Sequence, residues 1–344
     1  MRKEVLAVGC ALMVFCGGGE KNAGQHYESG WAAMEKKDYT TAVNEFQQVI
    51  DQNSRLAESY RAEGIAYYSE KAYPEAIAAF SRSLNNMDDP DKEFKKDVQF
   101  YLAQARMDYG EVDKAIEVYS EILKAGEDEQ AFFLRGKAYI SMEDYKNAEK
   151  DFQRALEGCE DYNLYINIYQ IYVDHNKAVD GDAYLKMALE LEPQDGEDCY
   201  HRGRIYEYEK NYEAARDELK TAMEQGYEDA MLLLGRVYLE MEDPASARSM
   251  YQEYLQKSEQ GAKAYNGLAM CDIYDGAYDS ALENIAQGLK ENSKEDEQGL
   301  LYNEIVAYEY KRDFATAKEK MKIYLEQYPE DEAALRENEF LSTR

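Results

Sequence analysis

The sequence predicts an all-α fold, a solenoid of about nine helical hairpins that ends in a capping helix. Two observations lead to this prediction. A segment of 34 residues has the spacing expected of two short helices joined by a tight turn, and the same spacing recurs along nearly the whole chain. In a repeat array each hairpin packs mainly against its neighbours, so the core is expected to run along the array instead of forming one ball.

The segment 129–162 shows the hairpin most clearly. Its small and aromatic residues are three or four positions apart, so within each of two helices they share one face. These residues are Phe132, Gly136 and Tyr139 in the first helix and Ala148, Phe152 and Ala155 in the second. Between the helices, Asp144 is placed to accept hydrogen bonds from the free backbone amides that open the second helix.

The same register occurs nine times. If Gly136 is taken as position 8 of the repeat, the equivalent residues are Gly30, Gly64, Ala103, Gly136, Tyr169, Gly203, Gly235, Ala269 and Ile305. Twelve residues later, position 20 holds Ala42, Ala76, Ala115, Ala148, Gly181, Ala215, Ala247, Ala281 and Ala317. Position 24 holds Phe46, Phe80, Tyr119, Phe152, Leu185, Leu219, Tyr251, Ile285 and Met321. Nine matches in one register are a strong signal, and they cover residues 23–331.

This pattern resembles the tetratricopeptide repeat, a helical hairpin of 34 residues. The resemblance implies a right-handed superhelical solenoid whose first helices line a concave groove for extended peptides or partner helices. It divides the chain into repeats at about 23–56, 57–90, 96–129, 129–162, 162–195, 196–229, 228–261, 262–295 and 298–331.

Three places are expected to depart from the regular array. Five additional polar residues between Asn85 and Asp91 predict a longer loop. In the fifth repeat Tyr169 replaces the glycine of position 8, and its bulk is expected to push the two helices apart. The segment 332–344 has one apolar stripe among charged residues, which predicts a helix that caps the end of the solenoid.

The charge of the chain limits its partners. Its 70 acidic and 40 basic residues give a formal net charge of -30. Nucleic acids and anionic lipid headgroups need Lys and Arg side chains to neutralise them, so both are disfavoured as partners. Protein or peptide segments that are neutral or basic are expected instead. The acidic residues also serve as a solvated outer face that keeps an elongated protein soluble.

The first 22 residues resemble a bacterial lipoprotein signal. Arg2 and Lys3 precede an apolar run over residues 5–15, which is too short to span a bilayer but suits a signal peptide. Cys16 and three glycines follow. The resemblance implies a lipid on Cys16, a flexible Gly-rich tether and a place on the extracytoplasmic face of a bacterial cell membrane. Phe15 departs from the small residue usual before such a cysteine, so an uncleaved anchor and a cytoplasmic chain are the alternatives.

The sequence contains none of the common catalytic, nucleotide-binding or metal-binding motifs. The three histidines, His26, His175 and His201, lie in different repeats. The chain is therefore expected to be no enzyme and to hold no cofactor or resident metal. The cysteines after Cys16 are Cys159, Cys199 and Cys271. Whole hairpins separate them, so they are expected to be buried thiols and to form no disulfide.

The resemblance places the candidate binding residues on the first helices, mainly at repeat positions 5, 6, 12 and 13. They are Tyr27, Arg61, Tyr68, Phe100, Phe133, Asn167, Tyr200, Tyr208, Asn266, Tyr274, Tyr302, Asn303 and Tyr310. Aromatic rings and amides of this kind suit a peptide backbone, a Lys or Arg side chain or the face of a sugar. The same aromatic rings would equally suit the closing of gaps between neighbouring first helices.

These observations predict a non-catalytic, membrane-anchored scaffold of the bacterial cell envelope that binds proteins or peptides. Two alternatives remain open at this stage. One is a module that binds glycan or a small ligand of the envelope, and the other is a cytoplasmic assembly or regulatory adaptor. A repeat fold determines how a surface is built, whereas what it recognises depends on particular residues.

Overall fold

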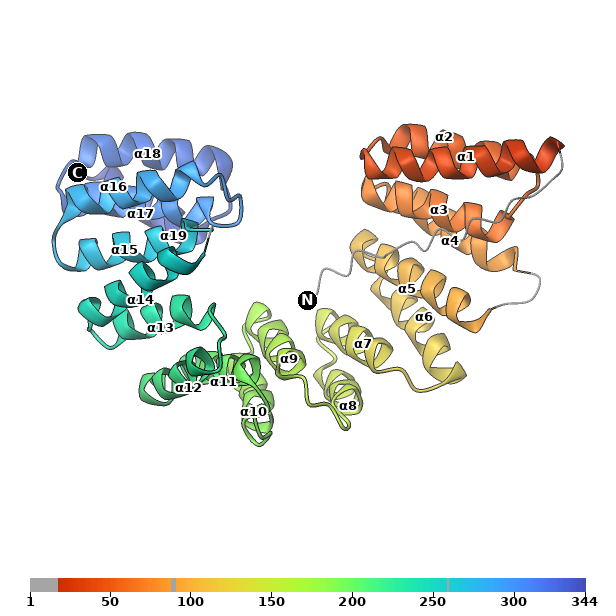
Figure 1. Cartoon of the computed structure of the whole chain (residues 1–344). Coiled ribbons are helices and arrows are strands. Elements are labelled where there is room, and N and C mark those ends of the chain that lie inside the picture. Colours follow the sequence, from red (N-terminus) through yellow and green to blue (C-terminus); the bar gives the residue numbers. More distant parts are fainter. Residues whose placement is uncertain (1–17, 88–90, 259) are drawn as a thin grey trace. The chain divides into compact units, whose positions relative to one another are not determined.

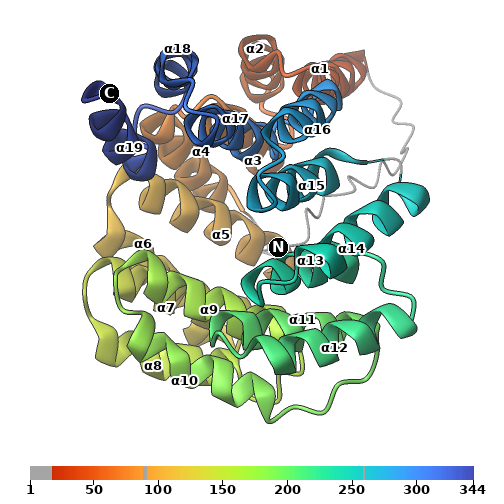
Figure 2. The same cartoon turned by 90° about the vertical axis from the view of Figure 1, so that its left-hand side faces the viewer.

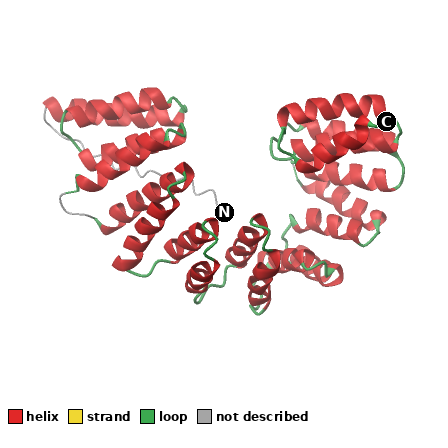
Figure 3. Cartoon of the chain, turned by 180° about the vertical axis from the view of Figure 1, so that it is seen from behind, coloured by secondary structure: helices red, strands yellow, loops and turns green. Residues whose placement is uncertain are grey.

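A computed structural model describes residues 18–87, 91–258 and 260–344. Within these residues it contains nineteen helices and no strand (Figure 3), which confirms the predicted all-α solenoid class. The chain divides into two compact units, residues 1–182 and 183–344. Each unit is described by itself below.

The first unit contains four consecutive hairpins, which pair α1 with α2, α3 with α4, α5 with α6 and α7 with α8, followed by α9 (Figure 1). The bounds are α1 (Gly18–Glu35), α2 (Tyr39–Asp51), α3 (Leu56–Ser69), α4 (Tyr73–Asn85), α5 (Lys92–Tyr109), α6 (Val112–Ala125), α7 (Glu129–Ser141), α8 (Tyr145–Ala155) and α9 (Tyr162–Asp174). Helix α10 (Ala178–Leu189) spans the boundary between the two units.

The second unit continues the pattern with four hairpins and a final helix. Its bounds are α11 (Gly196–Tyr208), α12 (Tyr212–Glu224), α13 (Ala230–Glu240), α14 (Pro244–Lys257), α15 (Ala262–Tyr274), α16 (Tyr278–Lys290), α17 (Glu297–Tyr310), α18 (Phe314–Gln327) and α19 (Glu332–Ser342). Each helix packs against the next one along the chain. The first helices also touch one another, as α13 does with α11 and α15, so they form one wall of the unit.

The contact between positions 8 and 24 explains the repeating pattern of glycine and a large residue. A Cβ atom added at Gly136 would lie only 2.7 Å from Cε1 of Phe152. The equivalent distance is 2.6 Å at Gly64, where the large residue is Phe80. Glycine at position 8 therefore lets the first helix lie directly on a fully buried ring of the second helix.

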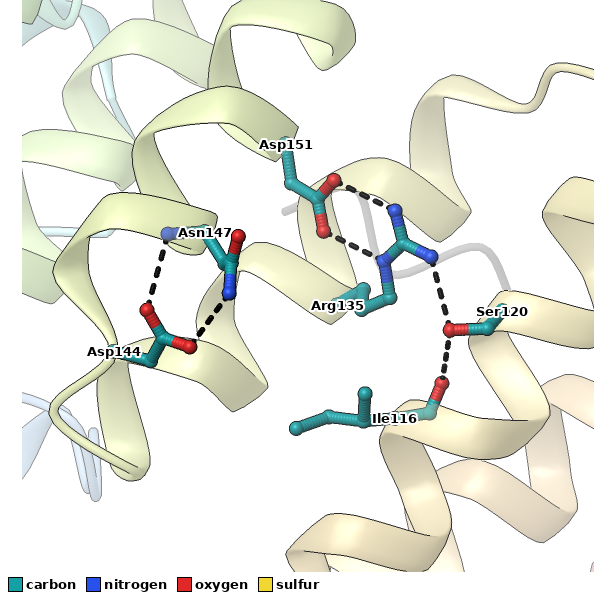
Figure 4. A network of polar contacts seen from close by, with 6 residues as sticks. All are labelled: Ile116, Ser120, Arg135, Asp144, Asn147 and Asp151. Carbon is teal, nitrogen blue, oxygen red and sulfur yellow. Dashed lines mark hydrogen bonds and ion pairs between the residues drawn. The ribbon is translucent and has the colours of Figure 1, made fainter.

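The turn inside each hairpin has a constant backbone geometry. Position 15 has a positive φ in all nine described repeats, although only two of these residues are glycines, Gly110 and Gly276. The next amide donates to the carbonyl of position 11, as from Asp144 N to Tyr139 O at 2.9 Å. The side chain of Asp144 then accepts from Asn147 N at 3.2 Å and caps the second helix (Figure 4), as predicted.

An ion pair between positions 7 and 23 links the two helices of some hairpins. In Figure 4, Arg135 on α7 donates to both carboxylate oxygens of Asp151 on α8, at 2.7 and 2.8 Å. It also donates to Ser120 Oγ at 2.9 Å, which ties the hairpin to the preceding one. The pair recurs between Arg202 and Glu218 at 2.8 Å. In the ninth repeat Lys320 and Glu304 form the pair with the charges exchanged, at 2.7 Å.

The structure corrects two of the expectations about irregular places. Residues 18–22, expected in a flexible tether, belong to α1. The longer loop expected between Asn85 and Asp91 is confirmed at both ends, because α4 ends at Asn85 and α5 begins at Lys92, capped by Asp91. Tyr169 does not push its hairpin apart at the contact with Gly181. A Cβ atom at Gly181 would lie 3.1 Å from Cδ2 of Tyr169, so the missing side chain at position 20 makes room for the large one at position 8.

Helix α19 occupies the place of a tenth first helix, over the last hairpin. Ala334 and Leu341 are its fully buried side chains, whereas Leu335 and Phe340 are about two-fifths exposed. Its inner stripe is therefore narrow, which suits the end of a repeat array. Among the described helices, none combines the length and hydropathy needed to cross a bilayer.

Candidate functional site

The second unit contains a groove of about 770 Å³ along the first helices α11, α13 and α15. Figure 2 shows these helices following one another in the unit. Eight of its lining residues come from repeat positions 2, 5 and 9, which are Asp229, Lys263 and Gly299, then Tyr200, Leu232 and Asn266, then Arg236 and Met270. The loops before α15 and α17 also contribute lining residues. The volume lies within the range of ordinary ligand sites.

Tyr251 of α14 forms the floor of the groove. Its ring lies between two glycines, because a Cβ atom at Gly235 would be 2.6 Å from Tyr251 Cζ and one at Gly267 would be 2.3 Å away. Tyr251 is 4% exposed. Burial raises the pKa of the Tyr251 hydroxyl, so this group stays protonated and able to donate a hydrogen bond.

Both cations of the groove are already paired with carboxylates. Arg236 binds both carboxylate oxygens of Glu207 at 2.5 Å. Lys263 lies 3.6 Å from Glu295 and 4.0 Å from Asp296. The groove is therefore acidic overall, since Asp229 and Glu291 also line it.

Asp229 and Glu291 are the groove carboxylates that form no ion pair within the described residues, and both are exposed. Asp229 also forms no capping hydrogen bond at the start of α13. The ring of Tyr200 lies on the same wall, 5.0 Å from the ring of Tyr227. Burial raises the pKa of the Tyr200 hydroxyl, so this ring too carries no charge.

Two of the residues predicted from the sequence line the groove, Tyr200 and Asn266. A third, Asn303, lies behind Asn266 and donates its Nδ2 to Asn266 Oδ1 at 2.7 Å. This bond orients the Asn266 amide so that its own Nδ2 remains available as a donor.

Four of the other eight predicted aromatic residues pack against the second helix of their own hairpin. The ring of Tyr27 lies 5.8 Å from Phe46, that of Phe100 lies 6.4 Å from Tyr119, and that of Phe133 lies 6.1 Å from Phe152. Tyr302 is 5.8 Å from Tyr324. These rings therefore contribute to the core, as the packing interpretation of the sequence allows.

The remaining predicted residues lie elsewhere. Arg61 is paired with Asp97 and lies 5.3 Å from the ring of Tyr101, and the Tyr68 hydroxyl donates to Asp108. Tyr274 and Tyr310 are more than half exposed, and Tyr310 stacks on Tyr278 at 6.0 Å. Asn167 is half-buried on α9, and Tyr208 ends α11. Cys16 lies outside the described residues.

The candidate residues predicted from the sequence did not include the acidic residues of the groove or its floor. Asp229 and Arg236 occupy repeat positions 2 and 9, so the repeat register could have identified them. Tyr251 stands at position 24, whose large residues indicated only packing within the hairpin, and Gly267 carries no signal in the sequence of its own repeat. Their contact joins neighbouring repeats, and only the structure reveals it.

The described residues show no group of three or more His, Cys, Asp or Glu side chains arranged to hold a metal ion. The thiols of Cys159, Cys199 and Cys271 are free. The last two are buried as expected, whereas Cys159 is only half-buried, which corrects the expectation for that residue. Burial raises the pKa of the Cys271 thiol to about 11, so this group stays protonated and is a poor nucleophile.

Comparisons with known proteins agree with the repeat. Family models described as tetratricopeptide repeat match residues 27–91, 200–262 and 232–297, and a second such model matches 129–161. Together they cover more than half of the chain. No curated protein matches it.

Several solved structures are similar to this chain. A tetratricopeptide repeat protein from Parabacteroides merdae has 16% identity and a TM-score of 0.46, over 83% of this chain and 99% of its own. The C-terminal part of a repeat protein from Cytophaga hutchinsonii has 16% identity and a TM-score of 0.44, over 70% and 99%. Yeast Tom70 has 15% identity and a TM-score of 0.49, over 89% and 85%.

The hairpins, their glycine-to-ring contacts and the family matches lead to one conclusion. This chain belongs to the tetratricopeptide-repeat family of protein-interaction scaffolds.

Proposed function

We propose that this chain is a non-catalytic scaffold that binds an extended peptide segment of a partner protein in the groove of the second unit. The observation that carries the proposal is the lining of that groove. Three successive first helices contribute aromatic, apolar, amide and charged side chains, which can meet the apolar, amide and charged groups of an extended peptide. The chemistry of the groove, with no activated nucleophile among its residues, suits binding better than catalysis.

The charge of the groove favours a segment with a basic residue. Four carboxylates line it against two cations, and both cations are already paired. Asp229 has no such partner, and the ring of Tyr200 lies on the same wall. A Lys or Arg side chain of the peptide would therefore lie near Asp229 and over Tyr200, where ion-pair and cation–π attraction add together.

A peptide library tests this proposal. The protein, without its first 17 residues, is labelled and applied to a positional-scanning library of decapeptides with blocked ends. We expect binding that depends on one Lys or Arg position. Asp229→Lys should weaken binding of the selected peptide at least about five-fold, as expected for the loss of one attractive contact and its replacement by repulsion.

Glu283→Lys is the matched control, because Glu283 is an exposed acid on α16 outside the groove and the substitution changes the net charge equally. Equal losses of affinity in both variants would show that the effect comes from the overall charge of the protein and not from Asp229 itself. Failure of every peptide to bind, together with stabilisation of the protein by cell-wall polysaccharide, would favour the glycan-binding alternative.

We also propose that the chain is anchored on the extracytoplasmic face of a bacterial membrane through a lipid on Cys16. The support is the N-terminal pattern of Arg2 and Lys3, an apolar run and then the cysteine. Mass spectrometry of the N-terminus of the protein purified from cells tests this. A diacylated Cys16 is expected, and Cys16→Ser should release the protein from membranes. An intact Met1 on a soluble protein would favour the cytoplasmic adaptor.

A further inference from the structure

Two large apolar side chains are exposed one after the other on the face of α15 that lines the groove. Met270 is part of the lining and is 40% exposed. Tyr274, which ends α15, stands one helical turn further along the same face and is 55% exposed. Helix α15 touches α17 (Figure 2), where Tyr310 has the same repeat position as Tyr274 and is 60% exposed. Exposed apolar surface of this kind marks a place where another molecule binds.

The fold gives the ring of Tyr274 no specific partner. Within the described residues the ring makes no aromatic or cation contact, and its hydroxyl forms no hydrogen bond. Four other aromatic residues predicted for the inner wall lie instead against the second helix of their own hairpin. Tyr274 is therefore a ring that the packing of the hairpins leaves available to a ligand.

The charge of the inner wall differs between the two ends of these first helices. At the start of α13, Asp229 is exposed and forms no ion pair within the described residues. At the end of α15, the acid that follows Tyr274 is Asp275, whose carboxylate is bound to Arg248 at 2.9 Å. The first end therefore attracts a cation. At the other end the neighbouring acid is already neutralised, so an uncharged side chain is favoured there.

We propose that Met270 and Tyr274 form an apolar subsite that continues the groove and takes a large aliphatic side chain, such as leucine, of the bound peptide. The proposal rests on the peptide-binding function proposed above and adds a second residue to the peptide that is recognised. The Lys or Arg of the peptide lies near Asp229, and the aliphatic side chain lies across Met270 against the ring of Tyr274. The peptide thus crosses from the start of one first helix to the end of the next.

The helices determine the spacing of the two peptide residues. Asp229 stands at repeat position 2 and Tyr274 at position 13, which separates them by about 16 Å along the helix direction. The neighbouring first helices α13 and α15 touch, so the step from one to the other adds about 9 Å sideways. The direct distance is about 19 Å, which an extended peptide covers in about five or six residues. The groove should therefore select a basic and a large aliphatic residue at this spacing.

The test uses decapeptides that keep the selected basic residue at position 2, carry one leucine at each of positions 4 to 10 in turn, and have serine elsewhere. A mirrored series has the basic residue at position 9, because the peptide can run in either direction. Dissociation constants are measured by fluorescence anisotropy. In at least one series we expect an optimum at a spacing of five or six residues. There leucine should tighten binding about ten-fold over the peptide without leucine, as burial of one large apolar side chain supplies.

Tyr274→Ala removes the ring. It should reduce the gain from leucine at the best spacing at least about five-fold, while leaving the affinity for the peptide without leucine within about two-fold. Tyr109→Ala is the matched control, because Tyr109 also ends a first helix, α5 of the first unit, and is 51% exposed. This control should leave the gain unchanged. Both tyrosines are half exposed at the end of a helix, so neither substitution removes a core residue.

The subsite is refuted if leucine adds no affinity, or if its gain is independent of spacing or largest at a spacing other than five or six. It is equally refuted if Tyr274→Ala keeps the gain or if Tyr109→Ala removes as much of it. In each of these cases, binding of the library peptide that still responds to Asp229→Lys would leave the proposed function intact. If no peptide of the library binds at all, the proposed function itself fails. The two failures are therefore distinguishable.

Discussion

Replacement of Glu63 by leucine should stabilise the first unit. Glu63 occupies position 7 of the second repeat, where other hairpins form an ion pair with position 23. In this repeat position 23 is Ala79, which has no charge to offer. Glu63 is 3% exposed, and its Oε2 has no hydrogen-bond partner in the structure. A carboxylate buried in this way costs roughly 1–3 kcal/mol. Leucine, which stands at this position in the third repeat as Leu102, removes that cost.

The direction in which the pKa of Glu63 is shifted determines how the stabilisation by Glu63→Leu should change with pH. Burial raises the pKa of the Glu63 carboxyl above its ordinary value, and the charge of Arg82 opposes this only in part. A carboxyl whose folded pKa is raised favours folding below its ordinary pKa of 4.5, and this contribution is lost as the pH rises through the folded value. The advantage of Glu63→Leu should therefore be fully present at pH 8 and should shrink on acidification.

The assay is hydrogen–deuterium exchange of peptides from α3 and α4, because repeat arrays open locally and a global melting curve averages over many hairpins. Glu63→Leu should slow exchange in these helices about five- to 150-fold at pH 8, which corresponds to about 1–3 kcal/mol. Glu58→Leu, at an exposed position of the same helix, is the control. Unchanged or faster exchange in Glu63→Leu at pH 8 would show that the carboxylate is paired and would refute the reasoning.

Three further predictions concern stability. Gly136→Ala should destabilise its hairpin by about 1–3 kcal/mol in urea denaturation, because the new Cβ would lie 2.7 Å from the Phe152 ring. Glu143→Gly should stabilise the same hairpin by about 0.5–1 kcal/mol in that assay, because Glu143 has a φ of 60° that favours glycine. Burial and the neighbouring Glu337 raise the pKa of Glu309 to about 7, so the protection factors of the α19 amides, which correct for the intrinsic rise of exchange with pH, should fall as the pH rises through 7. Glu337→Gln should abolish this dependence.

Each of these results has a control or a contrary outcome. Gly24→Ala has nothing within 4 Å of the new Cβ and should not destabilise the protein. A destabilised Glu143→Gly would mean that its side chain, and not the backbone, holds the turn. Protection factors in α19 that are insensitive to pH between 6 and 8 would contradict the contact between Glu309 and Glu337.

The fold could be predicted because its main determinant is local in sequence. Gly136 and Phe152 are sixteen residues apart, and their fit requires a small residue against a ring in every repeat that has this pair. In the fifth repeat, the size of the residue at position 8 does not by itself predict how the two helices pack. There the small and large residues exchange places, so Tyr169 fits against Gly181 and the hairpin is kept.

The groove could be predicted only in part, because the same repeat position serves different purposes. Phe133 and Tyr200 both occupy position 5. Phe133 finds the ring of Phe152 in its own hairpin, whereas the sixth repeat offers Leu219 there and Tyr200 lies instead against Tyr227. Whether a ring at position 5 can meet a ligand depends on which residues pack beside it. The sequence of a single repeat does not contain that information.

The left-handed turn has a consequence for how this chain can change. Seven of the nine residues with this turn conformation are not glycine, and they include lysine, arginine, glutamate and asparagine. The turn is held by backbone hydrogen bonds such as that from Asp144 N to Tyr139 O. The exposed side chain at position 15 is therefore not needed to hold the turn. The chain thus has a row of sites where a charge can be gained, lost or reversed while the hairpin stays closed. These sites hold four cations and two anions, so the acidic excess behind the net charge of -30 lies elsewhere in the chain, and the turns can change their charge independently of it.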